Sequence, residues 1–325
     1  MFKDLIPEFS LILAPMEAIT NKPFRKICKK YGADILVTEF IASDALARDV
    51  KDSVIKMGFD EMERPLGIQI FGNNAESLVK AVYIAERENP DFIDINWGCP
   101  VKKVAGKGSG SGIMNDIPKM VELTKAVVDA SSIPITVKTR LGYSEDSKPI
   151  VDIAERLQDV GIQALSIHGR TRAQMYKGEA DWSLIGEVKN NPRMTIPIFG
   201  NGDIDSPEKA VEFKNRYGVD GILIGRATIG NPFIFQQTKE LLEGKTPTII
   251  PISEKIEVCK AHLDGLIELR GEKNAIFEMR KAYSGYFKGL ANFKPYRLQL
   301  VTSVLYSEIQ SLLDQVLEIY SKEED

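Results

Sequence analysis

Among the three cysteines of this 325-residue chain, Cys99 has the sequence setting that best suits chemistry. It lies in the turn NWGCP at 96–100, directly after a short apolar run, whereas Cys28 and Cys259 lie in segments with helical spacing. A thiol can act as a nucleophile or as a proton donor. We expect Cys28 and Cys259 to be small buried hydrophobic residues. No pair of His or Cys residues has metal-ligand spacing, so no metal is expected.

Polar side chains stand at the ends of most other apolar runs in the sequence. They are Glu17, Gln69, Asn96, Lys138, His168, Arg170, Asn201, Asp203 and Arg226. If these runs are the parallel strands of one barrel, their carboxyl ends share one rim, where such barrels place their active sites. The sequence therefore predicts that reactive side chains gather at one mouth of a barrel.

Two of the runs end in glycine-containing segments that suggest a phosphate site. Gly200 and Gly202 follow one run, and Gly225 stands before Arg226 at the end of the next. Glycines allow backbone N–H groups to approach an anion closely, and the arginine supplies a fixed positive charge. The alternative is that the glycines merely permit tight turns.

Lys138 and His168 are each open to more than one interpretation. A lysine pointing from a buried strand requires an electron-rich or negative partner. That partner could be a flavin ring, whose N1–O2 edge gains negative charge on reduction, or a carboxylate inside the barrel such as Asp94 or Glu39. His168 could contact a cofactor, act as a general acid, or be a satisfied core residue.

The elements that would position these residues alternate regularly. Apolar runs predict strands at 11–16, 35–40, 66–71, 92–97, 135–140, 164–168, 196–199 and 221–225, and segments between them have helical spacing. Ser206 and Asn231 each precede a proline and predict helix starts. Eight strand–helix alternations favour a (β/α)₈ TIM barrel, an α/β fold. A doubly wound open sheet is the alternative, but no G-x-G-x-x-G follows the first strand.

The C-terminal part has a different pattern. After residue 245 the strand-like runs end, and 253–269, 274–290 and 295–320 have the spacing of amphipathic helices. We therefore expect a barrel domain at 1–245 and a small all-α helical-bundle domain at 246–325. Although the net charge is −4, residues 280–297 hold five basic residues, no acidic one, and five interleaved aromatic residues.

The segment after Cys99, residues 101–112, is rich in glycine and lysine. With Lys102 and Lys107 it could be a mobile lid that meets a phosphate backbone. The alternative is a flexible surface loop with no partner.

Several ordered motifs together resemble a known family. The segments APMEAITNKPFR (14–25), NWGCP (96–100), RTRAQMYKG (170–178), GNGDI (200–204) and IGRA (224–227) are similar to those of the tRNA-dihydrouridine synthases, in particular their bacterial B-type branch. Arg280, Lys281, Tyr286 and Lys288-Gly289 resemble the helical-domain signature of that family. The resemblance thus covers nearly the whole chain.

The resemblance implies an FMN enzyme that uses NADPH (or NADH) to reduce the C5=C6 bond of a uridine in the D-loop of tRNA. Hydride would pass from flavin N5 to C6, and Cys99, as a neutral thiol, would protonate C5 from the other face. The implied FMN-binding residues are Pro15, Met16, Glu17, Gln69, Lys138, His168, Asn201, Gly202, Asp203, Gly225 and Arg226. The implied substrate and tRNA contacts are Asn96, Arg170, Lys102, Lys107, Arg280, Lys281 and Tyr286.

The aromatic residues of 280–297 would then stack on exposed bases. Two positions depart from the family pattern: Ala18 stands where many relatives have glycine, and Ala282 stands where they often have histidine. With no signal peptide or membrane-spanning stretch apparent, we expect a cytoplasmic monomer that binds no membrane. The alternatives are an FMN barrel acting on a small pyrimidine, as dihydroorotate dehydrogenase does, and a non-catalytic RNA-binding barrel.

Overall fold

The computed structural model describes residues 2–323, so Met1 and residues 324–325, at the outer ends of the two expected domains, lie outside it. Within this part of the chain, nine strands form one parallel sheet in the order β1-β9-β8-β7-β6-β5-β4-β2, with β3 also paired to β4. The strands are β1 (Ser10–Leu13), β2 (Leu36–Val37), β3 (Ile41–Ala42), β4 (Leu66–Phe71), β5 (Phe92–Asn96), β6 (Ile135–Arg140), β7 (Ala164–His168), β8 (Ile198–Asn201) and β9 (Gly221–Ile224).

The sheet closes on itself, which confirms the barrel and excludes the open sheet. A parallel bridge joins Ile12 to Ile35, and the Leu13 N–H donates to the Ile35 carbonyl at 3.2 Å. The run expected as one strand at 35–40 contains only the short β2, and β3 begins just after the run ends. Between them Thr38 accepts the Gln69 N–H through its own hydroxyl, at 3.0 Å, so the pairing with β4 passes through a side chain there.

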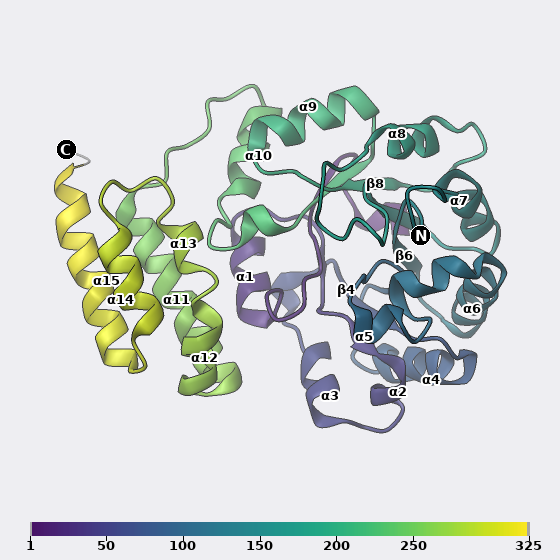
Figure 1. Ribbon diagram of the computed structural model, residues 1–325, viewed down its shortest axis with the longest axis horizontal. Coiled ribbons are helices and arrows are strands. Elements are labelled where there is room, and N and C mark those ends of the chain that lie inside the picture. The colour runs from purple at the N-terminus through teal and green to yellow at the C-terminus, as the bar shows by residue number, and fades with distance from the viewer. Residues whose placement is uncertain (1, 324–325) are drawn as a thin grey trace.

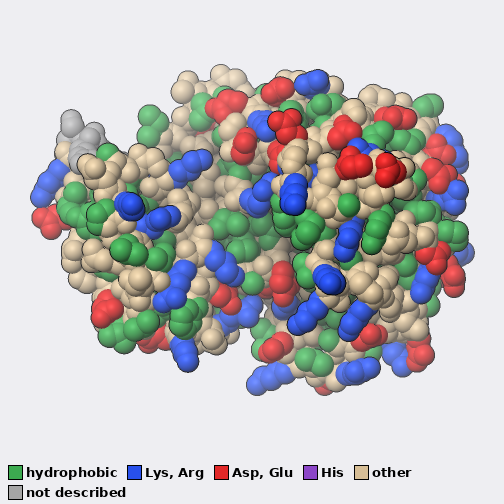
Figure 2. Space-filling model, viewed as in Figure 1, with side chains coloured by type: hydrophobic (Ala, Val, Ile, Leu, Met, Phe, Trp, Pro, Cys, Tyr) green, Lys and Arg blue, Asp and Glu red, His purple; other side chains and the backbone are tan. Residues whose placement is uncertain are grey.

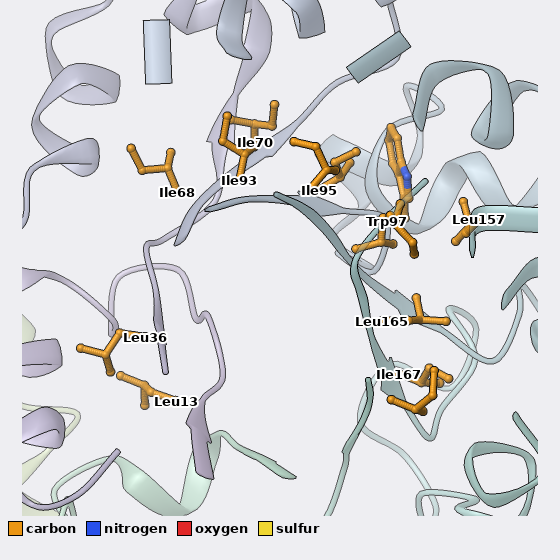
Figure 3. Close-up of a cluster of buried hydrophobic side chains, with 14 of the residues drawn as sticks. Leu13, Leu36, Ile68, Ile70, Ile93, Ile95, Trp97, Leu157, Leu165 and Ile167 are labelled. Atoms are coloured by element: carbon orange, nitrogen blue, oxygen red, sulfur yellow. The ribbon is translucent and has the colours of Figure 1, made fainter. Parts of the chain in front are cut away.

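Alternation along each strand separates two environments. Ile68, Ile93 and Leu165 lie with similar residues on the outer face, between the strands and the surrounding helices (Figure 3). Because strand side chains alternate between faces, their neighbours point into the barrel. At the carboxyl ends these inward residues are polar: they are Gln69, Asn96, Lys138, Arg140, His168 and Asn201.

The amino end of the barrel is filled by apolar side chains. Phe2, 1% exposed, packs edge-on against Phe92 with ring centroids 5.0 Å apart, and lies 6.3 Å from the Phe199 ring. The barrel is therefore a closed core at one end and polar at the other.

Helices cover the barrel in the expected alternation (Figure 1). They are α1 (Lys22–Lys30), α2 (Ser43–Leu46), α3 (Lys51–Met57), α4 (Ala75–Glu86), α5 (Lys102–Ala105), α6 (Ile117–Ala130), α7 (Ile150–Asp159), α8 (Ser183–Asn190), α9 (Pro207–Tyr217) and α10 (Ile234–Leu242). The barrel part also has the 3₁₀ turns η1 (Phe2–Leu5), η2 (Glu61–Glu63), η3 (Gly110–Asn115) and η4 (Arg226–Thr228), and η5 (Ser321–Glu323) follows the last helix of the chain. Ser206 caps α9 as expected, accepting the Lys209 N–H at 3.3 Å. Asn231 does not cap α10, which begins three residues later.

The C-terminal part is all helical and forms a separate lobe beside the barrel (Figure 1). Its helices are α11 (Ile252–Arg270), α12 (Glu272–Met279), α13 (Tyr283–Tyr286), α14 (Lys294–Thr302) and α15 (Tyr306–Tyr320). Five helices replace the three expected within residues 2–323. The expected boundary at 245/246 falls in the segment between α10 and α11 and remains a prediction.

Tertiary contacts explain the two breaks that divide the expected helices 274–290 and 295–320. A Cβ on Gly285, within α13, would lie 1.9 Å from the Ile229 carbonyl oxygen, so this short helix brings glycine backbone directly against the barrel. The start of α15 is capped from another helix, because Glu272 Oε1 accepts the Tyr306 N–H at 3.1 Å. In residues 2–323, no helix is long and apolar enough to cross a membrane, and no group of three or more His, Cys, Asp or Glu could hold a metal ion.

Candidate active site

A cavity of about 1660 Å³ opens at the carboxyl ends of the strands and continues between the barrel and the helical lobe. Figure 2 shows Lys and Arg side chains on both sides of the hollow between the two lobes. The expected site residues that line the cavity are Pro15, Met16, Glu17, Asn96, Cys99, Lys138, His168, Arg170, Asn201, Gly202, Asp203, Gly225, Arg226 and Tyr286. Gln69, Lys102, Lys107, Arg280 and Lys281 are not part of its lining.

Cys99 lies on the cavity wall with its backbone fixed on both sides. Its N–H donates to Asn96 Oδ1 at 2.8 Å, and its carbonyl accepts the Ser111 hydroxyl at 2.8 Å. The residue is 7% exposed. Burial raises the pKa of the Cys99 thiol, although the Val101 backbone and the charge of Arg140 act in the opposite direction. The protein therefore favours the neutral thiol, the form that can donate a proton.

A chain of buried hydrogen bonds orients Asn96, which in turn orients Cys99. Asn96 Nδ2 donates to Gln69 Oε1 at 2.8 Å, and Gln69 Nε2 donates to Asp94 Oδ2 at 2.6 Å. Asp94 also accepts the Thr136 hydroxyl at 2.5 Å, and burial raises its pKa to about 6. Gln69 thus lies beneath the cavity, with both ends of its amide bound to protein.

Lys138 points from β6 into the cavity and is bound to a neutral group. Its Nζ donates to Asn201 Oδ1 at 3.2 Å, and Asn201 Nδ2 donates to the Leu223 carbonyl at 2.9 Å. Burial and the charge of Arg140 together lower the pKa of Lys138 to about 8, although the charge of Asp94 acts in the opposite direction. The carboxylates of Asp94 and Glu39 are instead hydrogen-bonded to other groups. Of the two interpretations of Lys138, this geometry favours a ligand over an internal salt bridge.

His168 lies beside Asn201 in the sheet register and is 8% exposed. Burial and the positive charges of Arg140 and Lys138 lower its pKa well below the ordinary value. The imidazole is therefore neutral and suits hydrogen bonding to a cofactor better than general acid catalysis.

Asp203 holds two arginines at the rim. It accepts two hydrogen bonds from Arg170, at 2.8 and 2.7 Å, and one from Arg226 at 3.0 Å. Partial burial raises the pKa of Asp203, but the hydrogen bonds from Arg170 and the Ala180 N–H, together with the charges of both arginines, outweigh burial, so the pKa is lowered. Arg170 is 2% exposed and also donates to the Lys177 and Gly178 carbonyls. Arg170 and Asp203 therefore shape the loop after β7, and Arg226, with its side chain 57% exposed, reaches the cavity.

The segments after β8 and β9 offer backbone donors to an anion. Within residues 2–323, the N–H groups of Gly202, Asp203 and Arg226 make no hydrogen bond. Gly202 has φ +127°, and a Cβ there would lie 2.7 Å from the Ala180 Cβ, so only glycine fits. Free N–H groups beside an arginine are the features that hold a phosphate.

The segment after Cys99 is only partly a loop. Residues 102–105 form α5, where Lys102 is exposed, and Lys107 is exposed with its carbonyl bound to Asn73 Nδ2 at 2.6 Å. From Ser109 to Met114 the chain is buried, and Ser111 is anchored to Cys99. The exposed lysines precede an anchored segment, so 101–112 as a whole is not a free lid.

The expected stacking role of the aromatic residues in 280–297 is wrong for most of them. Tyr283, Tyr286, Phe287 and Phe293 are between 0% and 6% exposed and form the core of the helical lobe. The Tyr286 hydroxyl lies 3.1 Å from Nδ1 of the buried His262, and Cys28 and Cys259 are buried as expected. Amphipathic helices need such rings for their own packing, so interleaving with basic residues reflects helical periodicity here.

The basic residues expected to contact tRNA in this stretch have mixed surroundings. Arg280 Nη2 donates to the Ser303 carbonyl at 3.3 Å, and its guanidinium lies 4.3 Å from the Phe277 ring centroid. Lys281 Nζ donates to the Ala18 carbonyl at 3.3 Å. Lys288 is exposed and lines the cavity.

Two cavity residues were missed by the sequence analysis. Arg140 is 3% exposed, two residues after Lys138 on the same face of β6, and donates to the Gly98 carbonyl at 2.7 Å beside Cys99. Its position at i+2 from Lys138 was the available signal. Tyr176 is 57% exposed, and its ring centroid lies 5.1 Å from the Arg226 guanidinium. No sequence pattern indicated that contact.

Ala18 has a backbone conformation that favours glycine, with φ +57°. We expect Ala18→Gly to stabilise the protein by about 0.5–1 kcal/mol. A Cβ in the left-handed region costs about 1–2 kcal/mol, and the greater conformational entropy of glycine in the unfolded chain offsets part of the gain from removing it. Urea unfolding measures the change. Ala47→Gly is the matched control, since Ala47 is exposed with φ −60° and should be destabilised. Equal losses in both variants would contradict the strain at Ala18.

The fold and the polar rim define a TIM-barrel protein whose candidate active site has a thiol, a lysine and an anion cradle. The model of the family described as dihydrouridine synthase matches residues 12–319. The tRNA-dihydrouridine synthase B of Pseudomonas aeruginosa is 38% identical over 290 residues, 89% of this chain and 87% of that protein. That of Shewanella oneidensis is 36% identical over 313 residues, 95% and 96% of the two chains.

This chain therefore belongs to the dihydrouridine synthase family, which confirms the resemblance seen in its motifs. Among solved structures, histamine dehydrogenase from Rhizobium sp. 4-9 has a TM-score of 0.55 at 12% identity; the match covers 84% of this chain and 48% of that one. This likeness shows the fold alone. Family membership favours the expected reaction over a dihydroorotate dehydrogenase-like activity and over a non-catalytic barrel.

Proposed function

We propose that this protein binds FMN in the barrel mouth and reduces the C5=C6 bond of uridines in tRNA to dihydrouridine, with NADPH as reductant. One observation carries the proposal: a thiol favoured in its neutral form shares one cavity with Lys138 and with the unpaired N–H groups after β8 and β9. The names of the relatives, tRNA-dihydrouridine synthase B, support tRNA as the substrate.

The residues present fit a flavin mononucleotide. The N–H groups of Gly202, Asp203 and Arg226, with the Arg226 guanidinium, would hold the phosphate. Lys138, His168 and Asn201 would border the ring system, where Lys138 can stabilise negative charge. When bound, the flavin would supply the hydride for the double bond. Pro15, Met16, Glu17 and Gly225 line the same space.

Cys99 would donate the second hydrogen as a proton. Its thiol would transfer H⁺ to C5 of the uracil, and the resulting thiolate would be stabilised by the nearby Arg140, whose charge already lowers the pKa of Cys99. Asn96 fixes the backbone of Cys99 and lines the same cavity. Arg170 would act by holding the loop after β7 in place through Asp203.

The charge around the cavity suits an RNA phosphate backbone. Its lining contains twice as many basic as acidic residues; the basic ones are Lys103, Lys138, Arg140, Arg170, Lys209, Arg226, Lys255 and Lys288. Lys102 and Lys107 extend this surface beside α5. A uridine in the D-loop of tRNA can leave its stack at lower cost than one in a duplex. We place this activity in the cytoplasm, in a monomer.

The proposal is tested by purifying the protein and mapping dihydrouridine in tRNA. The protein should be yellow, release FMN on denaturation, and form dihydrouridine in tRNA from a strain that lacks this gene. NADPH and NADH are compared as reductants. A colourless protein that cannot be reconstituted with FMN would overturn the proposal. So would a flavoprotein that leaves the tRNA unchanged but oxidises small dihydropyrimidines.

A further inference from the structure

The loop between β1 and α1, residues 14–21, forms one wall of the cavity and is held from two sides. Pro15, Met16 and Glu17 line the cavity, and Ala18 follows in its left-handed conformation. The Ala18 N–H donates to Glu39 Oε1 at 2.6 Å, and its carbonyl accepts Lys281 Nζ at 3.3 Å. Glu39 belongs to the barrel and Lys281 to the helical lobe. The turn at Ala18 is therefore fixed partly by each.

Glu39 is itself coupled to the helical lobe. It is 2% exposed, and its Oε2 lies 3.6 Å from Arg270 Nη2. Lys56 Nζ lies 4.0 Å from Glu39 Oε1 and 2.5 Å from Glu17 Oε1. A buried carboxylate is stable only when cations compensate its desolvation. Because Arg270 is the last residue of α11, part of this compensation comes from the lobe outside the barrel.

Arg270 and Lys281 are in turn held within the helical lobe. Arg270 Nε lies 3.2 Å from Glu278 Oε1 on α12, and Lys281 lies two residues after the end of that helix. The lobes are in close contact around Ala18: a void of about 20 Å³, lined by Ala18, Glu278, Lys281 and Ala282 among others, has room for about one water molecule. Close packing transmits small displacements, so the position of α11 and α12 bears directly on the loop.

We propose that Arg270 and Lys281 are positioning residues, which act from the helical lobe on Glu39 and Ala18 to hold the 14–21 loop in the conformation that binds the cofactor. The identity of the cofactor as FMN rests on the proposed function, whereas the effect on the loop does not. This gives the helical lobe a role in building the barrel's own site. It also gives Lys281 a function within the protein, different from the tRNA contact expected from its motif.

The test compares Arg270→Met, Lys281→Met and Arg270→Lys in the full-length purified protein. Hydrogen exchange of the backbone amides in 14–21 reports the loop directly. We expect exchange about tenfold faster in both Met variants, since each removes a charge-assisted contact to the loop or to its anchor. The release of FMN on dilution should show binding weakened by about the same factor. Arg270→Lys keeps the charge and should recover part of both effects.

Lys260→Met is the matched control, because Lys260 lies on the same helix and pairs with Asp314 on α15 at 2.5 Å, away from the barrel. It should match the wild type in loop exchange and in FMN release. Wild-type exchange in Arg270→Met and Lys281→Met would overturn the inference, as would equal loosening in Lys260→Met. If Arg270→Met did not fold, Arg270→Lys and Lys281→Met would decide by the same readouts. A wild type without FMN would defeat the proposed function, and amide exchange would still decide this inference.

Discussion

Replacing Cys99 by alanine should slow dihydrouridine formation by about a hundred- to ten-thousandfold, the range over which a positioned proton donor contributes to a rate. The backbone of Cys99 is fixed by Asn96 and Ser111 through main-chain atoms, so the substitution removes the sulfur and leaves the turn in place. FMN content and flavin reduction by NADPH should be unchanged. A single turnover of pre-reduced enzyme with unmodified tRNA isolates the affected step.

Cys259→Ala provides the control for this variant. Cys259 is 0% exposed in the helical core, so its loss should lower stability without changing the single-turnover rate. If Cys99→Ala kept more than about a tenth of the wild-type rate, the loss of rate would be smaller than a proton donor contributes. That result would remove Cys99 from the mechanism.

The pH dependence of the same single turnover should reflect the thiol. A proton donor works in its protonated form, and burial raises the pKa of Cys99 above the ordinary value of about 8.5. The rate should therefore stay level through about pH 8.5 and fall only at higher pH, as the thiolate forms. In Cys99→Ala the residual rate should lack this alkaline fall. A decline that begins below neutral pH would show that the protein lowers the pKa of Cys99.

The strands of the barrel could be predicted because both of their faces are constrained. The run 66–71 is apolar where it meets the helices, and its inward Gln69 is the exception that marks the polar mouth. The same alternation holds for Lys138 on β6 and His168 on β7. Polar residues within buried runs are therefore enough to predict, from the amino-acid sequence, which end of the barrel carries the candidate site.

What could not be predicted depends on contacts between distant parts of the chain. The pairing of Asp203 with Arg170, 33 positions apart, makes these residues a structural pair at the rim, whereas their motifs indicated separate ligand contacts. The break before α15 depends on a cap from Glu272. The burial of Tyr286 depends on His262 and the packing of α11. Local sequence carries none of this information.

Lys138→Met should both weaken FMN binding and slow flavin reduction, the latter by about a hundred- to a thousandfold, as when a preorganised charge is removed from a reacting centre. Lys138 interacts with Asn201 through a neutral amide, and its pKa of about 8 shows a cation destabilised by burial. An electron-rich ring would relieve that cost. Methionine keeps most of the side-chain volume, so the barrel should stay folded.

The pH dependence gives this variant a sharper signature. Without ligand, the wild type loses the Lys138 proton above about pH 8, so FMN binding must take up a proton and should weaken as pH rises beyond that value. The flavin-free protein should also gain stability between about pH 8 and 10.4, because only the unfolded chain then retains this proton. Lys138→Met should lose both dependences.

Lys255→Met is the control, since Lys255 lines the helical end of the same cavity and its substitution removes an equal charge. Its FMN affinity should keep the wild-type pH profile. FMN dissociation constants at about pH 7 and pH 9, on either side of the Lys138 pKa, with stopped-flow reduction by NADPH, supply the comparison. Identical profiles in Lys138→Met and wild type would mean that the lysine does not face the flavin. Its lowered pKa would then be only a consequence of burial among Arg140 and its other neighbours.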